Sequence, residues 1–450
     1  MSLEQYGYEE QLDRALTLSD LVVYGLIFMV PIAPFTVFGF VWQEADGMVA
    51  LAFLIGLVGM LFTALSYAAM SQTFPLAGSV YAYVQRGLHQ SAGFLAGWLI
   101  LLDYILIPAL LYLFSAVALK PLVPQVPGWV WLVGFVSLNA TANLLGIRFT
   151  ARLYKVLLAL ELLTLALFVV FGALALYRGA GAGGLTLAPL YDAHHFSLTT
   201  VAGATSIAVL SFLGFDAIST LAEESAGARN AVARATILSL VLIGALFMLQ
   251  TWIAADLGQG MQFASAETAF YDIAARAGGP ALRLTAVAGI VIALGIANAM
   301  AAQAAVSRVL FAMARDRKLP AVLAVVHPRF KTPYVSTLLV AGMSLLVGLC
   351  FAHRVDDLSR VVNFGALTSF ALLHLAVAYH HIIRQRTGAW LQHLIFPLAG
   401  FAVIIYVLYG MDRTAKVLGG CWVAAGICYY LILARSAQGR AGTVTFPPAQ

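Results

Sequence analysis

The sequence predicts an all-α integral membrane protein with twelve transmembrane helices. Of its 450 residues, 62% are hydrophobic and 10% are charged, whereas soluble proteins carry about 25% charged residues. The apolar residues form runs of about 20, the length that a helix needs to cross a bilayer. Helices also satisfy their own backbone hydrogen bonds in lipid. Two of the runs are interrupted near their middle, which is typical of secondary transporters.

The expected spans are separated by polar loops. They lie at 18–43, 47–72, 91–119, 128–146, 154–177, 198–222, 233–256, 281–312, 333–352, 358–382, 393–411 and 414–434. The first and sixth are the interrupted ones, which favours two five-helix repeats of the LeuT type, the second inverted in the membrane, followed by two further helices. The expected units are a cytoplasmic segment 1–16, repeats 17–180 and 181–385, helices eleven and twelve within 386–436, and a flexible tail 437–450.

The distribution of charge sets the expected orientation and excludes several classes of protein. Of the 25 Lys and Arg residues, 17 fall in loops on the side of the N-terminus, which places both termini in the cytoplasm. The net charge of +5 is spread over these loops, with no basic run for nucleic acid. The three cysteines form neither a disulfide framework nor a metal site, so we expect no cofactor.

The sixth span carries the most informative interruption. Its sequence, A-V-L-S-F-L-G-F-D-A-I-S-T-L-A-E-E-S from Ala208 to Ser225, places Gly214 and Asp216 inside an apolar run. A carboxylate at that depth is costly unless it faces a partner or a wet cavity. The first span is interrupted by Pro31 and Pro34. Unwound backbone of this kind is tolerated only where it lines a cavity.

Four stretches resemble one superfamily of transporters. F-T-A-L-S-Y-A-A-M-S-Q-T-F-P-L-A-G-S-V-Y-A-Y-V at 62–84, G-F-L-A-G-W-L-I-L-L-D-Y at 93–104, S-F-L-G-F-D-A-I-S-T-L-A-E-E-S at 211–225 and S-R-V-L-F-A-M-A-R-D-R-K-L-P at 307–320 are similar to the amino acid–polyamine–organocation permeases. Within that superfamily they resemble the bacterial putrescine importers. The resemblance implies a central site between broken helices one and six, alternating access in a bacterial inner membrane, and ion-coupled import of an amine.

The break in the first span departs from the amino-acid-transporting members. Those usually carry a glycine-rich stretch whose backbone N–H groups hold the substrate carboxylate, whereas this chain reads M-V-P-I-A-P from Met29 to Pro34. Proline has no N–H, so two donors are missing from such a cradle. We therefore expect a substrate without a carboxylate. Ile32, Ala33 and Thr36 in this break, with Ser211 and Gly214 in the sixth span, are expected to line the site.

Two deep carboxylates are the expected ligands for a cationic substrate. Asp216 would complete a site for an ammonium group at the helix break, where carbonyls carry partial negative charge; alternatively it only caps the second half-helix. Asp103, in the apolar third span, could hold the second end of a diamine, or it could bond a buried hydroxyl or amide. Tyr104, Phe212 and Phe215 are candidates for the apolar wall and for cation–π contact, with simple packing as the alternative.

Four further residues are candidates for roles in coupling, gating and the cavity wall. Glu161 lies near the place where related proton-coupled members carry a lysine, so it could carry a coupling proton; it could instead pair with Lys155 or Arg152. Asp216 is the other coupling candidate. Glu223 and Glu224 are expected to hold a cytoplasmic gate through ion pairs, with Arg229 and Arg234 following them. Asn298, among small residues, either bonds a neighbouring helix or lines the site.

These observations predict a membrane carrier, active as a monomer or a homodimer, that imports a small cationic amine such as putrescine. A proton is favoured over sodium as the coupling ion. The alternatives are an amino-acid permease and an exchanger of the same superfamily. An enzyme is disfavoured, because the sequence holds no metal-ligand cluster, no nucleophile with an evident base and no phosphate loop.

Overall fold

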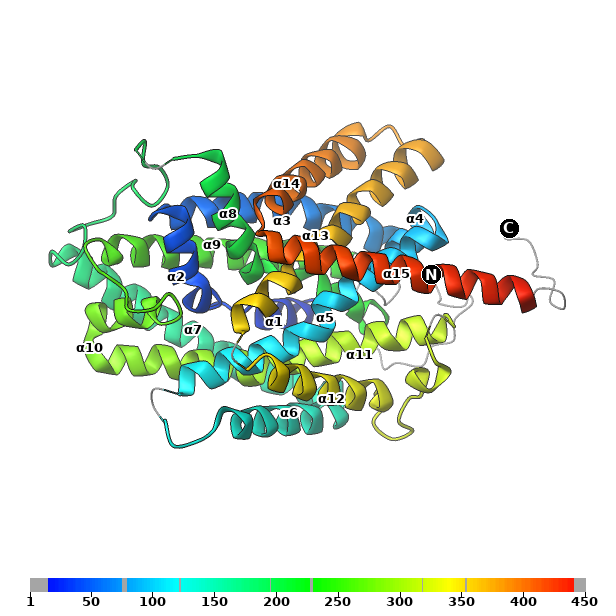
Figure 1. Ribbon diagram of the computed structural model, residues 1–450, viewed down its shortest axis with the longest axis horizontal. Coiled ribbons are helices and arrows are strands. Elements are labelled where there is room, and N and C mark those ends of the chain that lie inside the picture. Colours follow the sequence, from blue (N-terminus) through cyan, green and yellow to red (C-terminus); the bar gives the residue numbers. More distant parts are fainter. Residues whose placement is uncertain are drawn as a thin grey trace.

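The computed structural model is a bundle of long helices that run roughly along its longest axis (Figure 1). It describes residues 15–74, 79–120, 123–194, 196–226, 230–317, 319–352 and 354–440. Within these residues there is no strand, and only one isolated β-bridge joins Leu16 to Ser225. The predicted all-helical class is therefore confirmed.

Fifteen α-helices make up the described bundle, with short 3₁₀ and π-helical turns between some of them. The helices are α1 (Leu18–Met29), α2 (Pro34–Ala45), α3 (Val49–Thr73), α4 (Ser79–Gly87), α5 (Gln90–Leu119), α6 (Gly128–Leu144), α7 (Ile147–Tyr177), α8 (Leu198–Ala208), α9 (Ala231–Gly258), α10 (Ala269–Ile290), α11 (Ala299–Arg315), α12 (Tyr334–Cys350), α13 (Val355–Ala378), α14 (Phe396–Gly410) and α15 (Arg413–Arg440). The turns are η2 (Val209–Phe212), η3 (Phe215–Glu224), η4 (Val291–Asn298), η5 (Ala321–Ala324), η6 (Tyr379–Arg384) and η7 (Leu391–Ile395).

The described helices are long and apolar enough for a multi-pass membrane protein. Nine helical stretches pass that test, and a tenth does if α1 and α2, which meet at 48°, form one span. Helices α6 and α12 have 17 residues each, about 26 Å at 1.5 Å per residue, which is near the lower limit for crossing. The count of twelve spans, the repeat and the division into units stay predictions.

The eighth span begins differently from the prediction. Helix α10 starts at Ala269, twelve residues before the predicted start of the span, and leads through η4 into α11. Gly278 and Gly279 have non-helical backbone angles, with φ of 73° at Gly279, and Pro280 follows them. The chain therefore bends here, because proline cannot continue the preceding turn.

Both predicted helix breaks are present, and they pack against each other. Helix α1 ends at Met29, Val30 has a φ of 55°, and α2 restarts with Pro34 at its first position, where a missing N–H costs nothing. In the sixth span, α8 and η2 end before Gly214, whose φ is 113°. A side chain there would collide with the ring of Phe28 in α1, so glycine is required for the close approach.

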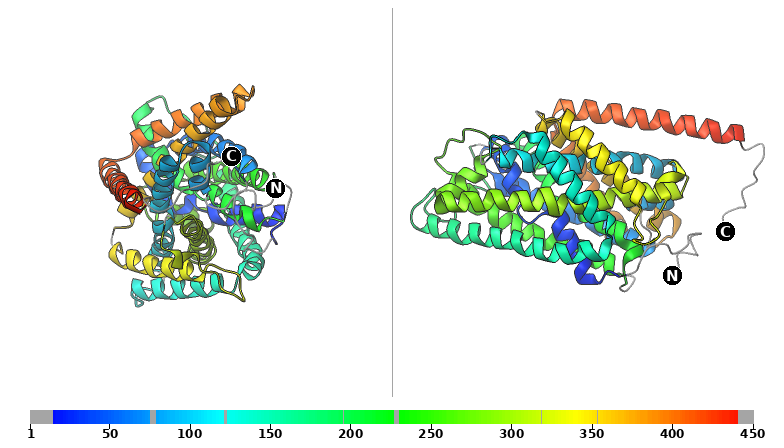
Figure 2. Two further views of the ribbon diagram at one scale, coloured as in Figure 1. Left: turned by 90° about the vertical axis from the view of Figure 1, so that its right-hand side faces the viewer. Right: turned by 90° about the horizontal axis from the view of Figure 1, so that it is seen from below.

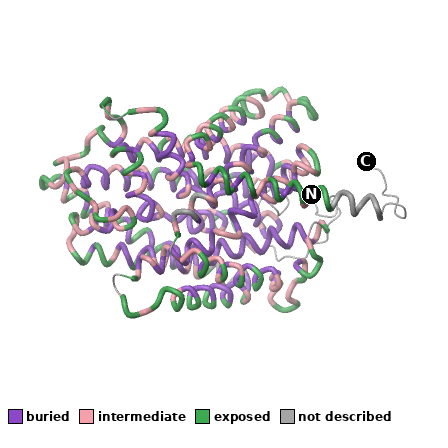
Figure 3. Tube along the Cα trace, viewed as in Figure 1, coloured by how far each residue is buried: buried purple, intermediate pink, exposed green. Residues whose placement is uncertain are grey.

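The broken sixth span lies at the centre of the bundle, and the last two helices lie at its edge. The stretch Leu198–Glu224 is 89% buried along its most apolar window, compared with 17% for Arg413–Ile432. Figure 2 shows α15 along the outer surface of the bundle, and Figure 3 shows the buried residues gathered around the middle. This placement puts the two breaks where a central site requires them.

Candidate functional site

A small cavity lies between the two helix breaks. It has a volume of about 40 Å³ and is bounded by the α1–α2 break, α5, η2 and η4. Four of the predicted site residues line it: Ala33, Thr36, Ser211 and Asn298. A cavity of this size holds a few water molecules. The structure is therefore closed around a space that a diamine could enter only after a rearrangement.

Two polar side chains in the cavity wall lack a hydrogen-bond partner. The Ser211 hydroxyl and the Asn298 Oδ1 atom are both buried and unpaired, whereas the Thr36 hydroxyl donates to the Ala33 carbonyl at 2.9 Å. Asn298 ends the π-helical turn η4, and such turns are frequent at functional sites. Buried polar atoms are nearly always paired in native proteins. These two oxygens are therefore suited to bind a substrate that offers N–H groups.

Next to the cavity lies an acid–tyrosine cluster, formed by Tyr67, Ser79, Asp103, Tyr104 and Asp216. The Tyr104 hydroxyl donates to Asp216 Oδ2, and the Ser79 hydroxyl donates to the same oxygen at 3.5 Å. The Ser79 oxygen is also 3.2 Å from the Tyr67 hydroxyl. Asp216 Oδ1 is buried without a partner. The cluster thus holds one carboxylate oxygen in place and leaves the other available.

Asp103 brings a second carboxylate to this cluster. Its side chain is buried, its Oδ1 atom has no partner, and it is near enough to Asp216 for their charges to interact. Among the described residues, neither carboxylate forms a salt bridge with a lysine, arginine or histidine. Burial of uncompensated negative charge is costly. A cationic ligand would relieve this cost.

The α5 helix connects the cluster to the cavity. Asp103 and Ile107 are four residues apart and share one helical face, and Ile107 lines the cavity. The separation along the axis is about 6 Å. In the sixth span, Ser211 and Leu213 line the cavity, and Asp216 follows within one turn. Both carboxylates therefore belong to residues within about one helical turn of residues that line the cavity.

The predicted aromatic residues are placed in the core rather than in the cavity wall. Phe215 packs edge-on against Tyr67 at 5.8 Å between ring centroids, and Phe212 packs against Phe247 at 5.0 Å. Neither they nor Ile32 or Gly214 line the cavity. The cavity wall instead has other aromatic and aliphatic side chains that the sequence did not single out, namely Phe28, Met29, Val37, Ile107, Leu110, Leu111, Phe114, Leu210, Leu213 and Leu294.

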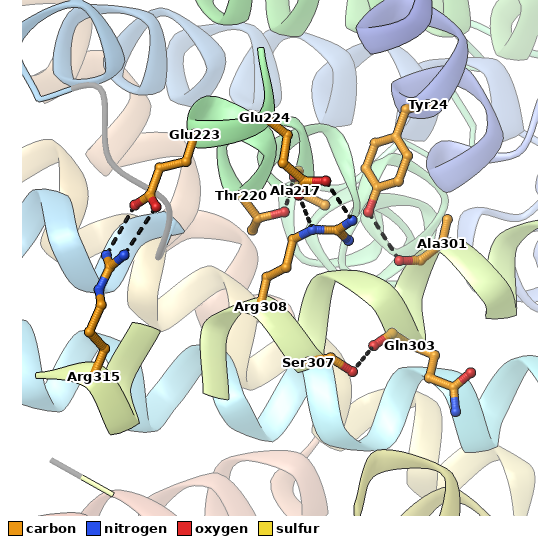
Figure 4. A network of polar contacts seen from close by, with 10 residues as sticks. All are labelled: Tyr24, Ala217, Thr220, Glu223, Glu224, Ala301, Gln303, Ser307, Arg308 and Arg315. Atoms are coloured by element: carbon orange, nitrogen blue, oxygen red, sulfur yellow. Dashed lines mark hydrogen bonds and ion pairs between the residues drawn. The ribbon is translucent and has the colours of Figure 1, made fainter. Parts of the chain in front are cut away.

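Ion pairs join η3 to α11 at one end of the bundle (Figure 4). We call it the inner end, because the sequence predicts that it faces the cytoplasm. Arg315 of α11 holds Glu223 through two hydrogen bonds of 3.0 Å, and Arg308 of the same helix pairs with Glu224. The prediction that these glutamates form ion pairs is confirmed. It placed the partners on Arg229 and Arg234, whereas the described partners come from α11; Arg229 lies outside the described residues.

Further hydrogen bonds join the elements at the inner end. The backbone N–H groups of Ala15 and Leu16 donate to the Glu224 carbonyl at 3.1 Å, and the Tyr24 hydroxyl donates to the Ala301 carbonyl at 3.0 Å. The residues just before α1 are thereby joined to η3, and α1 is joined to α11. Opening this end would require these contacts to separate together.

Comparisons with known proteins show the family of the chain. The model of the amino acid permease family matches residues 20–416. The chain belongs to the amino acid permease family. It is 30% identical over 433 residues to the low-affinity putrescine importer PlaP of Escherichia coli, covering 95% of both chains. It is 26% identical to the branched-chain amino acid permease BcaP of Bacillus subtilis, covering 95% of this chain and 94% of that one, and 23% identical to the methylthioribose transporter of Bacillus subtilis, covering 96% of both.

Membership of this family makes the permease a transporter and not an enzyme, as the sequence predicted. Its amino-acid- and putrescine-transporting relatives confirm the resemblance to the amino acid–polyamine–organocation superfamily. The substrate differs among these relatives, so it has to be argued from the site itself.

Two larger cavities adjoin the central one on the side away from the inner end. One, of about 200 Å³, is lined by Val37 and Leu210, and the other, of about 350 Å³, by Thr36; Phe114 lines both. All four residues also line the central cavity. The two larger cavities therefore share part of their walls with the central cavity, on the side of the helix breaks opposite the ion pairs between η3 and α11.

The structure does not bring Glu161 together with the other candidates. Glu161 lies on α7 and lines a separate cavity against α10, and both of its carboxylate oxygens are buried and unpaired. The alternative of an ion pair with Lys155 is not found, because Lys155 pairs with Asp20 at 2.7 Å. A role of Glu161 in coupling stays a prediction.

Proposed function

We propose that this permease imports a small organic diamine, of the putrescine type, by alternating access across a bacterial cytoplasmic membrane. The observation that carries the proposal is the set of four buried, unpaired oxygens at and beside the helix breaks. They belong to Ser211, Asn298, Asp103 and Asp216. Each can accept a hydrogen bond, and two belong to carboxyl groups. Ammonium groups offer three N–H donors each and the opposite charge, so they complement this set.

The backbone at the first break supports an amine over an amino acid. Pro31 and Pro34 have no N–H, the Val30 N–H donates to the Leu26 carbonyl at 2.9 Å, and the Ala33 N–H donates to the Val30 carbonyl at 2.9 Å. The break therefore offers few backbone donors to a substrate carboxylate. In the proposal, the Asp216 and Asp103 carboxylates bind the ammonium groups once the helix breaks rearrange, and the Ser211 and Asn298 oxygens accept hydrogen bonds from the substrate on its way through the central cavity.

In the proposed cycle, the diamine enters from the outer cavities and reaches the carboxylates as the helix breaks rearrange. Binding neutralises the charge of the acid–tyrosine cluster, and the outer path closes around the substrate. The ion pairs between the glutamates of η3 and the arginines of α11 then separate and open the cytoplasmic side. An inside-negative potential favours entry by about 2.3 kcal/mol per charge per 100 mV, and a proton is the proposed coupling ion.

Ligand-dependent thermal stability of the purified permease tests the substrate class. A ligand present at 100 times its Kd stabilises the folded state by about 2.7 kcal/mol. Putrescine and cadaverine should raise the Tm, and alanine and leucine should leave it unchanged. Stabilisation by leucine without stabilisation by diamines would support the second candidate, an amino-acid permease. That candidate is favoured by the similarity to the branched-chain amino acid permease BcaP.

A further inference from the structure

A cavity separate from those at the helix breaks contains a buried carboxyl group that the proposed function does not use. It lies between α7 and α10, has a volume of about 290 Å³, and shares no lining residue with the central cavity. Glu161 lines it with both oxygens unpaired, and its side chain is fully buried. Two unpaired oxygens on one buried carboxyl group call for a partner.

The remaining wall of this cavity supplies no partner for that carboxyl group. Thr164 and Thr285 are its only other polar side chains, and their hydroxyls donate to the carbonyls of Leu160 and Ala281 in their own helices, each at 3.0 Å. The other lining residues are aliphatic or glycine. The cavity therefore combines one anionic or acidic group with an apolar wall.

The cavity opens on the outer surface of the bundle, at membrane depth. Leu160, Leu163 and Leu284 in its wall are 42%, 55% and 52% exposed. Glu161 is nine residues from Arg152 and sixteen from Tyr177, the ends of its apolar span, so it lies about 13 Å or more from either end. A ligand would reach it from the hydrocarbon part of the bilayer.

We propose that this cavity is a binding site for a lipophilic monoamine that enters from the bilayer. The amine nitrogen would bind the Glu161 carboxyl group as an ion pair, and the alkyl chain would lie among the leucines. Charge complementarity favours this ligand, because an ammonium group supplies both the donors and the counter-charge that the wall lacks. The site is separate from the diamine path, so it does not depend on the proposed substrate.

Photolabelling of the full-length permease in lipid nanodiscs tests the site. The probe is decylamine carrying a diazirine on its alkyl chain, and labelled peptides are mapped by mass spectrometry. Labelling should concentrate on α7 and α10, saturate, and be displaced by unlabelled decylamine at least tenfold better than by decanol or decanoic acid. Excess putrescine should not displace it.

Three variants separate a specific site from a lipid-filled groove. Glu161→Gln keeps the shape of the side chain and should reduce the labelling at least tenfold. Ala288→Phe fills the cavity from its exposed edge without changing Glu161, and it should also abolish labelling. Ala166→Phe is the matched control, because Ala166 is an exposed alanine of α7 outside the cavity wall. Labelling that persists in Ala288→Phe, or equal displacement by decanol or putrescine, would overturn the proposal.

Discussion

Replacing Asp216 with asparagine removes the negative charge of the proposed ligand and keeps its shape. The amide oxygen can still accept the hydrogen bonds that Tyr104 and Ser79 donate to Oδ2. The new amide nitrogen takes the position of Oδ1, which has no partner in the structure. The local fold is therefore retained, and the main loss is the counter-charge for an ammonium group.

The size of that loss follows from the burial of the site. Removing one partner of a buried, hydrogen-bonded charge pair costs about 2–5 kcal/mol of binding free energy. At about 1.4 kcal/mol per tenfold change, a loss near the middle of that range, about 3 kcal/mol, raises the Kd roughly 100-fold. The unpaired amide nitrogen lowers the free energy of unfolding by about 1–3 kcal/mol. Removal of a buried negative charge raises the free energy of unfolding and so offsets this loss.

Isothermal titration of purified Asp216→Asn with putrescine measures this effect, and a thermal melt without ligand checks the fold. Tyr104→Phe is the matched control, because it removes a donor to Asp216 and leaves the charge in place. The Kd of Tyr104→Phe for putrescine should change less than tenfold. A wild-type putrescine Kd in a folded Asp216→Asn protein would refute the assignment of Asp216 as a ligand.

Three further variants test other parts of the structure. Asp103→Asn should weaken putrescine binding about tenfold or more but leave the binding of butylamine, a monoamine, nearly unchanged. Paired titrations with the two amines measure this difference. An equal loss of affinity for both amines would contradict a two-carboxylate site. Gly214→Ala should destabilise the protein by about 2 kcal/mol or more, because of its positive φ and a collision with a phenyl ring of α1; Gly134→Ala, where nothing lies within 4 Å of an added Cβ, should not lower the Tm. Arg308→Gln should lower the free energy of unfolding by about 3–5 kcal/mol, because it leaves Glu224 buried without its counter-charge. Adding Glu224→Gln should recover much of the lost Tm. A further loss of Tm in the double variant would argue against the ion pair.

The helical class, most of the long apolar helices and both breaks could be predicted from the sequence, because each depends on local signals; the start of α10 and the short helix α4 could not. A run of apolar residues marks a span, and Pro31, Pro34 and Gly214 interrupt a helix wherever it packs. The central position of the sixth span also followed from its buried carboxylate. Ala33, Thr36 and Ser211 then meet at one cavity because the breaks of the first and sixth spans face each other, and η4 brings Asn298 to the same cavity.

Partners supplied by distant parts of the chain could not be predicted. Arg308 is 84 residues from Glu224, and Ser79 is 137 residues from Asp216; no local pattern pairs them. The sequence also could not predict which neighbouring helix Glu161 faces. Apolar residues occur on all sides of α7, so the sequence pattern does not show which side of the helix is turned toward the core. The packing of α7 against α10 and η4 places Glu161 in a cavity that shares no lining residue with the central one.

Uptake of labelled putrescine into proteoliposomes, under an inside-negative potential and against empty liposomes, tests the central claim most directly. Unlabelled cadaverine, spermidine, arginine and alanine serve as competitors. The proposed site predicts saturable uptake that diamines block and alanine does not. Absence of putrescine uptake, in protein that an amino acid stabilises against heat, would show that the proline-bearing break binds a carboxylate, and it would contradict the assignment of an amine substrate.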